Sequence, residues 1–129
     1  MPATVFSANN FLNCVFRGIS ITAPTNLYMA LFNGDPQGIG TELTSAGGYA
    51  RQLIPTFSAA ASKAITNSTS INFGVASADY SAQVTHIAFF DASSSGNMWY
   101  SAVLAAPKTI LHFDEFAELI GQLNFQLAS

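Results

Sequence analysis

From residue 26 onward the chain is a series of short apolar runs separated by turn-forming residues, and this pattern limits the fold more than any other feature. The breaks are rich in Gly, Pro, Asn, Asp and Ser, and no second long helical period follows the first segment. Strand candidates are residues 26–33, 49–54, 70–75, 84–91, 97–105, 108–113 and 119–127. We therefore predict a mainly β fold, an antiparallel β-sandwich of about seven or eight strands, jelly-roll-like or barrel-like.

Two of these runs differ from the others because they are apolar on both faces. Residues 27–32 and 87–90 offer no polar side, so each is expected to lie between the sandwich core and a second layer. The last run, in contrast, alternates, with Gln122, Asn124 and Gln126 on one face and an apolar row on the other. That row consists of Leu123, Phe125 and Leu127.

The first twenty residues have helical periodicity. Leu12, Val15, Phe16 and Ile19 recur at the spacing of one helix face, Ser7 is a candidate N-cap and Gly18 a candidate stop. We expect this apolar stripe to dock on the sandwich. The chain then forms one domain, residues 1–129, with a helical segment at 1–20 and the β-sandwich at 26–128.

The composition indicates that part of the surface contacts protein. Half of the residues are hydrophobic, 9% are charged and the mean hydropathy is +0.32, against a usual charged fraction of about 25%. The longest apolar stretch, residues 27–32, is too short to span a bilayer, so we expect no membrane span. Only four Lys and Arg residues are present, and they are scattered, so direct nucleic-acid binding is not expected.

The sequence contains the residue types of one possible catalytic site. Cys14 with His86 or His112 as base and Asp91 as acid would make a nucleophilic site on paper. No known signature surrounds the cysteine, and Cys14 reads better as a small hydrophobe on the helix. We predict no enzymatic activity, no catalytic residue and no cofactor.

Other residues of the sequence allow metal binding or sugar binding as alternatives. The run from Asn33 begins like a calcium loop, but its twelfth position is Thr44 rather than Glu, and a hairpin turn fits better. An acidic group, Asp114, Glu115 and Glu118, is typical of a solvated corner between strands. Trp99, Tyr100, Tyr28 and Asn97 would suit a sugar if they were exposed on one surface, although such aromatic residues commonly fill a core. No metal site is predicted.

Several blocks of sequence follow one another in a distinctive order and spacing. They are the helix ending at Phe16-Arg17-Gly18, residues 26–32, Asp35-Pro36, Gly40-Thr41-Glu42, residues 47–52 and residues 84–91. Together these blocks resemble a family of small phage and prophage proteins usually labelled phage tail fibre protein or phage structural protein, and the resemblance covers nearly the whole chain.

The resemblance implies a virion protein, made in the host cytoplasm, and such proteins include capsid cement or decoration subunits as well as tail components. Fibre proteins are typically long, with repeats or coiled-coil shafts, and this sequence has no heptads. We therefore expect a cement subunit that stabilises the assembled head, with a tail fibre or tail tip as the alternative. The expected partners are copies of itself, as a homo-oligomer with a trimer as the favoured form, and the major capsid protein or other virion proteins.

The expected assembly surface lies at the N-terminal end. If the stripe at Leu12 docks on the sandwich, the side chains on the other sides of the helix need a partner outside the chain. The predicted interface residues are Phe6, Asn9, Asn10, Phe11 and Cys14. The loop from Asp35 to Glu42 is expected to face solvent.

Overall fold

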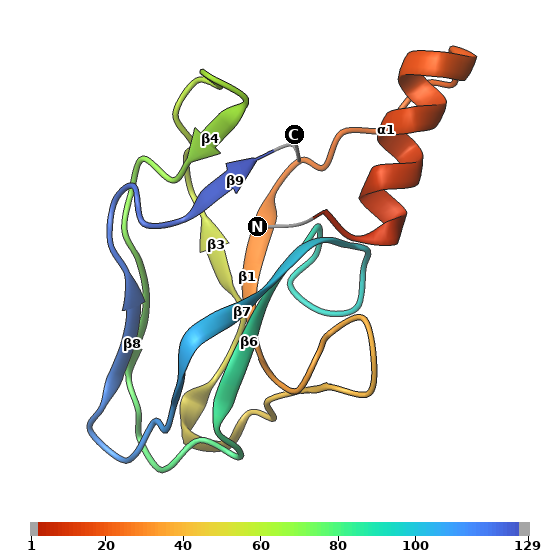
Figure 1. Ribbon diagram of the computed structural model, residues 1–129. Coiled ribbons are helices and arrows are strands. Elements are labelled where there is room, and N and C mark those ends of the chain that lie inside the picture. Colours follow the sequence, from red (N-terminus) through yellow and green to blue (C-terminus); the bar gives the residue numbers. More distant parts are fainter. Residues whose placement is uncertain (1–2, 127–129) are drawn as a thin grey trace.

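The computed structural model describes residues 3–126, which form one helix and nine β-strands (Figure 1). The elements in chain order are α1 (Val5–Arg17), β1 (Leu27–Asn33), β2 (Thr41–Glu42), the 3₁₀ turn η1 (Ala46–Gly48), β3 (Gln52–Ile54), β4 (Ala64–Thr66), β5 (Ile71–Val75), β6 (Val84–Phe90), β7 (Met98–Lys108), β8 (Glu115–Glu118) and β9 (Asn124–Gln126). The predicted fold class, mainly antiparallel β layers with one N-terminal helix, is confirmed. The strands described do not close into a barrel.

One sheet of five strands forms the first layer. Strand β1 pairs with β6, β6 pairs with β7, and the short strands β2 and β3 both pair with the other edge of β1, all antiparallel. The prediction that residues 27–32 and 84–90 are interior is confirmed, because β1 and β6 lie at the centre of this sheet. Met29, Leu31 and Phe89 have no exposed surface.

Two separate ribbons, β5–β8 and β4–β9, form the second layer over one face of the sheet. Their apolar side chains and those of the sheet make the main core, in which Phe125 packs edge-to-face on Phe89 at 4.8 Å between ring centroids. The predicted alternation of the last strand is confirmed for Leu123 and Phe125, which are buried, while Leu127 lies outside the described residues.

The opposite face of the sheet carries a second, smaller cluster. Ala30 and Phe32 of β1 and Ala88 and Phe90 of β6 are buried there, with Met98 packed against them. This face accounts for the apolar character of β1 and β6 on both sides, since each contributes to two clusters.

Three expectations about element boundaries were wrong. Residues 108–113 are not a separate strand, because β7 continues to Lys108 and the chain then turns, with Phe113 in the left-handed region at φ 74°. The acidic corner at 115–118 is instead strand β8, which buries Phe116. Residues 119–122 form a turn rather than a strand.

That turn is fixed by a buried polar side chain. Asn67 has no exposed surface, and its amide donates to the carbonyls of Thr69 and Leu119 and accepts from the Leu123 amide. Its own backbone carbonyl accepts from Gly121 at 3.0 Å. A turn ordered by a residue more than fifty positions away leaves no local pattern in the sequence.

Gly47 provides a test of how closely the 44–51 segment packs. Its φ is 73°, and an added Cβ would lie 2.4 Å from the Ala78 carbonyl oxygen. Gly121 has a similar φ of 79° but open space around it. We expect Gly121→Ala to lower the free energy of unfolding by about 1–2 kcal/mol from backbone strain alone, and Gly47→Ala to lower it clearly more. Equal midpoints for the two variants in urea unfolding would contradict this packing.

Candidate assembly surface

The first turn of α1 is fixed to the sheet by hydrogen bonds. Thr4, not Ser7 as predicted, is the N-cap, and its hydroxyl accepts from the Ser7 amide at 3.3 Å. The Thr4 amide donates to the Trp99 carbonyl at 3.1 Å, and the Thr4 and Ser7 hydroxyls donate to the Met98 and Trp99 carbonyls. The base of the helix is therefore attached to the beginning of β7.

An aromatic contact and a loop side chain complete this attachment. The ring of Phe6 packs edge-to-face on Trp99 at 5.1 Å between centroids. Gln37 accepts from the Val5 amide at 3.1 Å and donates to the Ser101 hydroxyl at 3.4 Å. The expectation that the 35–42 loop simply faces solvent is thus incomplete, because Gln37 links this loop to the start of α1.

Beyond the first turn, α1 extends away from the sheet (Figure 1). Ser7 is its only buried residue. The helix ends as predicted at Gly18, which is in the left-handed conformation and donates to the Asn13 carbonyl.

Four apolar side chains of α1 point away from the rest of the chain. With 3.6 residues per turn, Leu12, Phe16 and Val5 lie opposite Ser7, and Val15 flanks them. We refer to Val5, Leu12, Val15 and Phe16 as the outer stripe; their exposed fractions are 69%, 50%, 57% and 77%. The expectation that the stripe containing Leu12, Val15, Phe16 and Ile19 docks on the sandwich was therefore wrong.

The physical reason is that polar groups determine the orientation of the helix. Burial of the Thr4 and Ser7 hydroxyls on β7 carbonyls places the Ser7 side of the helix against the sheet. These bonds leave the outer stripe facing solvent, although an apolar stripe of this kind normally covers a core.

The five predicted interface residues fall into two groups. Asn9, Phe11 and Cys14 are exposed on α1, and 44% of Phe11 is accessible. Phe6 and Asn10 instead make contacts within the chain, since Phe6 packs on Trp99 and the Asn10 amide donates to the Phe6 carbonyl at 2.9 Å. The role of all five in assembly stays a prediction.

In the described part of the chain, the residues of the catalytic hypothesis are not brought together into a site. Cys14 is on α1, His86 on β6 beside the Thr85 hydroxyl, and His112 is stacked on Phe113. Asp91 accepts from Asn97 and from the Trp99 indole, so it does not orient either histidine.

Residues 3–126 contain neither a metal-binding cluster nor a membrane-spanning helix. Among residues 3–126, no group of three His, Cys, Asp or Glu side chains is placed to hold a metal ion. The Asp35 carboxylate accepts from the Gln37 amide in a tight turn, as the hairpin interpretation predicts. None of the helices in this part of the chain is long and apolar enough to cross a membrane.

The aromatic residues considered for sugar binding do not share one surface. Trp99 and Asn97 line a cleft of about 430 Å³ beside α1, whereas Tyr100 lines an apolar groove near β9. The cleft is also lined by Phe6, Asn10, Ser20, Thr22, Ala23, Pro24, Thr25 and Asp91.

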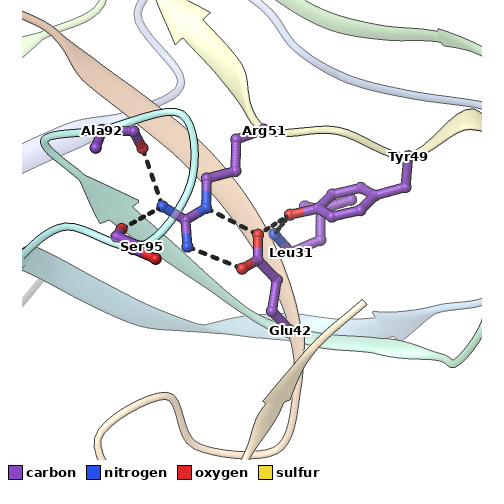
Figure 2. Close-up of polar contacts among 6 residues, drawn as sticks. All are labelled: Leu31, Glu42, Tyr49, Arg51, Ala92 and Ser95. Atoms are coloured by element: carbon purple, nitrogen blue, oxygen red, sulfur yellow. Dashed lines mark hydrogen bonds and ion pairs between the residues drawn. The ribbon is translucent and has the colours of Figure 1, made fainter. Parts of the chain in front are cut away.

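A buried ion pair supports the turn that carries this cleft (Figure 2). Arg51, only 7% exposed, donates from Nε and Nη2 to the two carboxylate oxygens of Glu42, each at 2.9 Å. Its Nη1 donates to the carbonyls of Ala92 and Ser95 in the β6–β7 turn, and its guanidinium lies 3.8 Å from the centre of the Phe90 ring. Arg51 thus joins β2 to the turn that precedes Trp99.

Tyr49 extends this network into the main core. Its hydroxyl donates to Glu42 at 2.6 Å and accepts from the Leu31 amide at 3.0 Å. Burial raises the pKa of Tyr49, and the bond to Glu42 raises it further. Burial also tends to raise the pKa of Glu42, but hydrogen bonds from Arg51 and Tyr49 outweigh it, so the pKa lies below the ordinary value.

The sequence matches a known protein family over nearly its whole length. The family described as podophage GP4 fiber I protein gp80 matches residues 2–126. The chain belongs to this family of phage fibre proteins. No curated protein matches the sequence. Two of the blocks that carried the resemblance, Gly40-Thr41-Glu42 and residues 47–52, contain Glu42, Tyr49 and Arg51 of the ion-pair network, so in this fibre-family chain these three residues have a structural role.

The network predicts an acid-sensitive contribution to stability. Because the folded pKa of Glu42 is lowered, its stabilisation is present above the unfolded value of about 4.5 and is lost as the pH falls through the folded pKa. We expect Glu42→Gln to lower the free energy of unfolding by about 2 kcal/mol at neutral pH, with a smaller difference from wild type in acid. Urea unfolding of both proteins, from neutral pH to below pH 4.5, measures this difference in the free energy of unfolding.

Glu115→Gln is the matched control, because Glu115 is exposed on β8. The role assigned to the Glu42 carboxylate would be contradicted if the difference in free energy of unfolding between wild type and Glu42→Gln stayed constant with pH.

Proposed function

We propose that the protein is a non-enzymatic structural subunit of the phage particle, made in the host cytoplasm, which joins its neighbours through the outer stripe of α1. The exposure of this stripe is the observation that carries the proposal. An isolated helix of 13 residues is marginal in water, and burying each large apolar side chain is worth roughly 1.5–3 kcal/mol. A neighbouring subunit that covered the stripe would supply the packing that α1 lacks.

Two positions on the particle follow from this proposal. The family description favours a fibre or tail-tip subunit, and we place that first. A capsid cement or decoration subunit is the second position. It is favoured by the compact β layers of residues 3–126, which contain no shaft-forming repeat. The same outer stripe would serve in either position.

The proposed partners are copies of this chain and other virion proteins, with the major capsid protein as the partner in the cement position. We propose a homo-oligomer, since a closed symmetric assembly covers the same apolar surface on each copy. A trimer is the form that we favour for the cement position, because decoration subunits commonly occupy threefold positions. Asn9 and Phe11, exposed on α1 next to Phe16 and Val15, would lie in or near this interface, whereas Cys14 is exposed on the Ser7 side of the helix, two turns further along.

The double variant Leu12→Ser with Phe16→Ser tests the outer stripe. Both side chains are at least half exposed and face away from the sheet, so we expect unchanged urea unfolding of the β layers. We expect at least a tenfold loss of self-association or of incorporation into particles, measured by sedimentation and by quantifying the protein in purified virions.

Leu111→Ser with Val103→Ser is the matched control, because these side chains are 50% and 70% exposed on the body of the protein. The proposal fails if the Leu12 and Phe16 double variant assembles and is incorporated like this control.

The cleft beside Trp99 supports a second candidate function, binding of a neutral saccharide of the host surface. Its lining combines two aromatic side chains, two amides, three hydroxyls and the Asp91 carboxylate. Burial tends to raise the pKa of Asp91, but hydrogen bonds from Asn97 and Trp99 lower it below its ordinary value. A charged Asp91 would accept from sugar hydroxyls and would repel anions.

The single tryptophan makes this candidate directly testable. Because Trp99 is the only tryptophan, its fluorescence reports on the cleft. We expect saturable changes in emission when purified bacterial polysaccharides are titrated in, weakened several-fold by Thr22→Val and unaffected by Thr109→Val outside the cleft. If no polysaccharide in the panel changes the emission, the cleft is not a saccharide site.

A further inference from the structure

An apolar groove lies between the β4–β9 ribbon and the five-stranded sheet. It has a volume of about 280 Å³ and an almost entirely apolar lining. Phe57 and Tyr100 pack edge-to-face on Phe125 at 5.8 and 5.4 Å between centroids, so the aromatic wall of the groove is continuous with the core. The remaining lining residues are Leu27, Ala60, Lys63, Ala64, Ile65 and Gln126.

The rim of this groove is a strained hairpin turn. Ala61 and Ala64 exchange backbone hydrogen bonds at 2.9 Å, and the two residues between them, Ser62 and Lys63, have φ values of 51° and 65°. A turn with two residues in the left-handed region favours Asn-Gly, and L side chains adopt it at a cost in free energy. Backbone strain of this kind is concentrated at functional sites of proteins.

We propose that this groove receives the outer stripe of α1 from a second copy of the chain. The inference rests on the proposed function and deepens it by naming the partner and the surface that it offers. An amphipathic helix that places its apolar face in an apolar groove is a common mode of recognition. Figure 1 places α1 and the β4–β9 ribbon at the same end of the molecule, so both surfaces are available to one neighbour.

The helix of the same chain cannot fill the groove in this way. Thr4 and Ser7 are bound to β7 carbonyls, and these bonds turn the outer stripe away from the sheet. Rotating the stripe inward would break them and expose Phe6, which packs on Trp99. The occupant therefore comes from another copy.

The areas agree with what a stable assembly requires. An aromatic side chain hides about 150–250 Å² when buried, and a Val or Leu roughly 100 Å². At the observed exposures, the outer stripe and Phe11 present roughly 400–500 Å². A copy that contributes one helix and one groove would bury roughly 500–600 Å², so a reciprocal pair would bury roughly 1,000–1,200 Å² in total, against about 1,000 Å² as the lower bound for a specific interface.

Pairing of α1 with α1 would be less complete. Such a bundle would cover the outer stripe but leave the groove at Phe57 and Tyr100 open to water. Insertion of α1 into the groove covers both apolar surfaces with a single type of contact, and in a closed ring or a reciprocal pair every copy is satisfied.

Directed cross-linking tests the proposal in the full chain. Cys14, the single cysteine, is first changed to Ser, and Val15→Cys and Ala60→Cys are then introduced in separate preparations. Val15 is in the outer stripe and Ala60 lines the groove. On mixing under mild oxidation, we expect a disulfide between the two different variants to form well ahead of either homodimer, identified by mass spectrometry of the linked peptides.

A substitution that fills the groove gives an independent measurement. Ala60→Trp should weaken self-association at least tenfold in sedimentation without changing the unfolding of the β layers. Ala106→Trp is the matched control, an exposed alanine on β7 outside the groove.

Three results would overturn the groove proposal: a predominance of disulfides between two Val15→Cys chains, self-association of Ala60→Trp equal to that of the control, or a wild-type protein that stays monomeric. Each of them is distinguishable from failure of the proposed function. That failure requires the Leu12 and Phe16 double variant to enter particles normally.

Discussion

The buried guanidinium of Arg51 is the interaction on which the arrangement of the molecule depends. A buried charge is tolerated only when its donors are satisfied, and Arg51 meets this requirement through both oxygens of Glu42 and two carbonyls of the β6–β7 turn. The geometry of Arg51 thereby fixes the turn that leads into Trp99. The Trp99 ring packs on Phe6, and the Trp99 carbonyl accepts hydrogen bonds from Thr4 and Ser7. The position of α1 therefore depends on the Arg51–Glu42 ion pair, which lies on the other side of the β6–β7 turn.

The two faces of the central sheet are covered by different means. The β4–β9 and β5–β8 ribbons cover one face with a large aromatic core. On the other face the apolar cluster is small, and Arg51 lies directly over Phe90. A cation over an aromatic ring protects apolar surface while its charge stays paired, so this face is closed by one side chain and the turns that it holds rather than by a third layer of strands.

Much of the sheet could be predicted from the sequence, and the reason is local. Residues 27–32 and 87–90 are apolar on both faces, and Leu123 and Phe125 alternate with polar neighbours. In each case the pattern within the strand itself is enough to predict which of its side chains are buried. Strand β8 and the 119–122 turn were missed because partners distant in the sequence, such as Asn67, determine them. For the candidate site, the existence and the end of α1 were predictable. Its orientation was not, because it depends on hydrogen bonds from Thr4 and Ser7 to carbonyls more than ninety residues away.

The orientation of α1 fixes its first turn within the chain and at the same time leaves its outer stripe exposed. Its polar anchors are satisfied within the chain, so the free subunit places α1 without any partner. The remaining turns of the helix have only their own backbone bonds and the Gly18 cap, which are marginal for a helix of this length. Order in those turns is therefore coupled to the covering of the outer stripe. Under the proposed function, a neighbour that covered the stripe would stabilise the helix and the contact together, and the residues that make the exposed surface unfavourable in water would make the assembled form favourable.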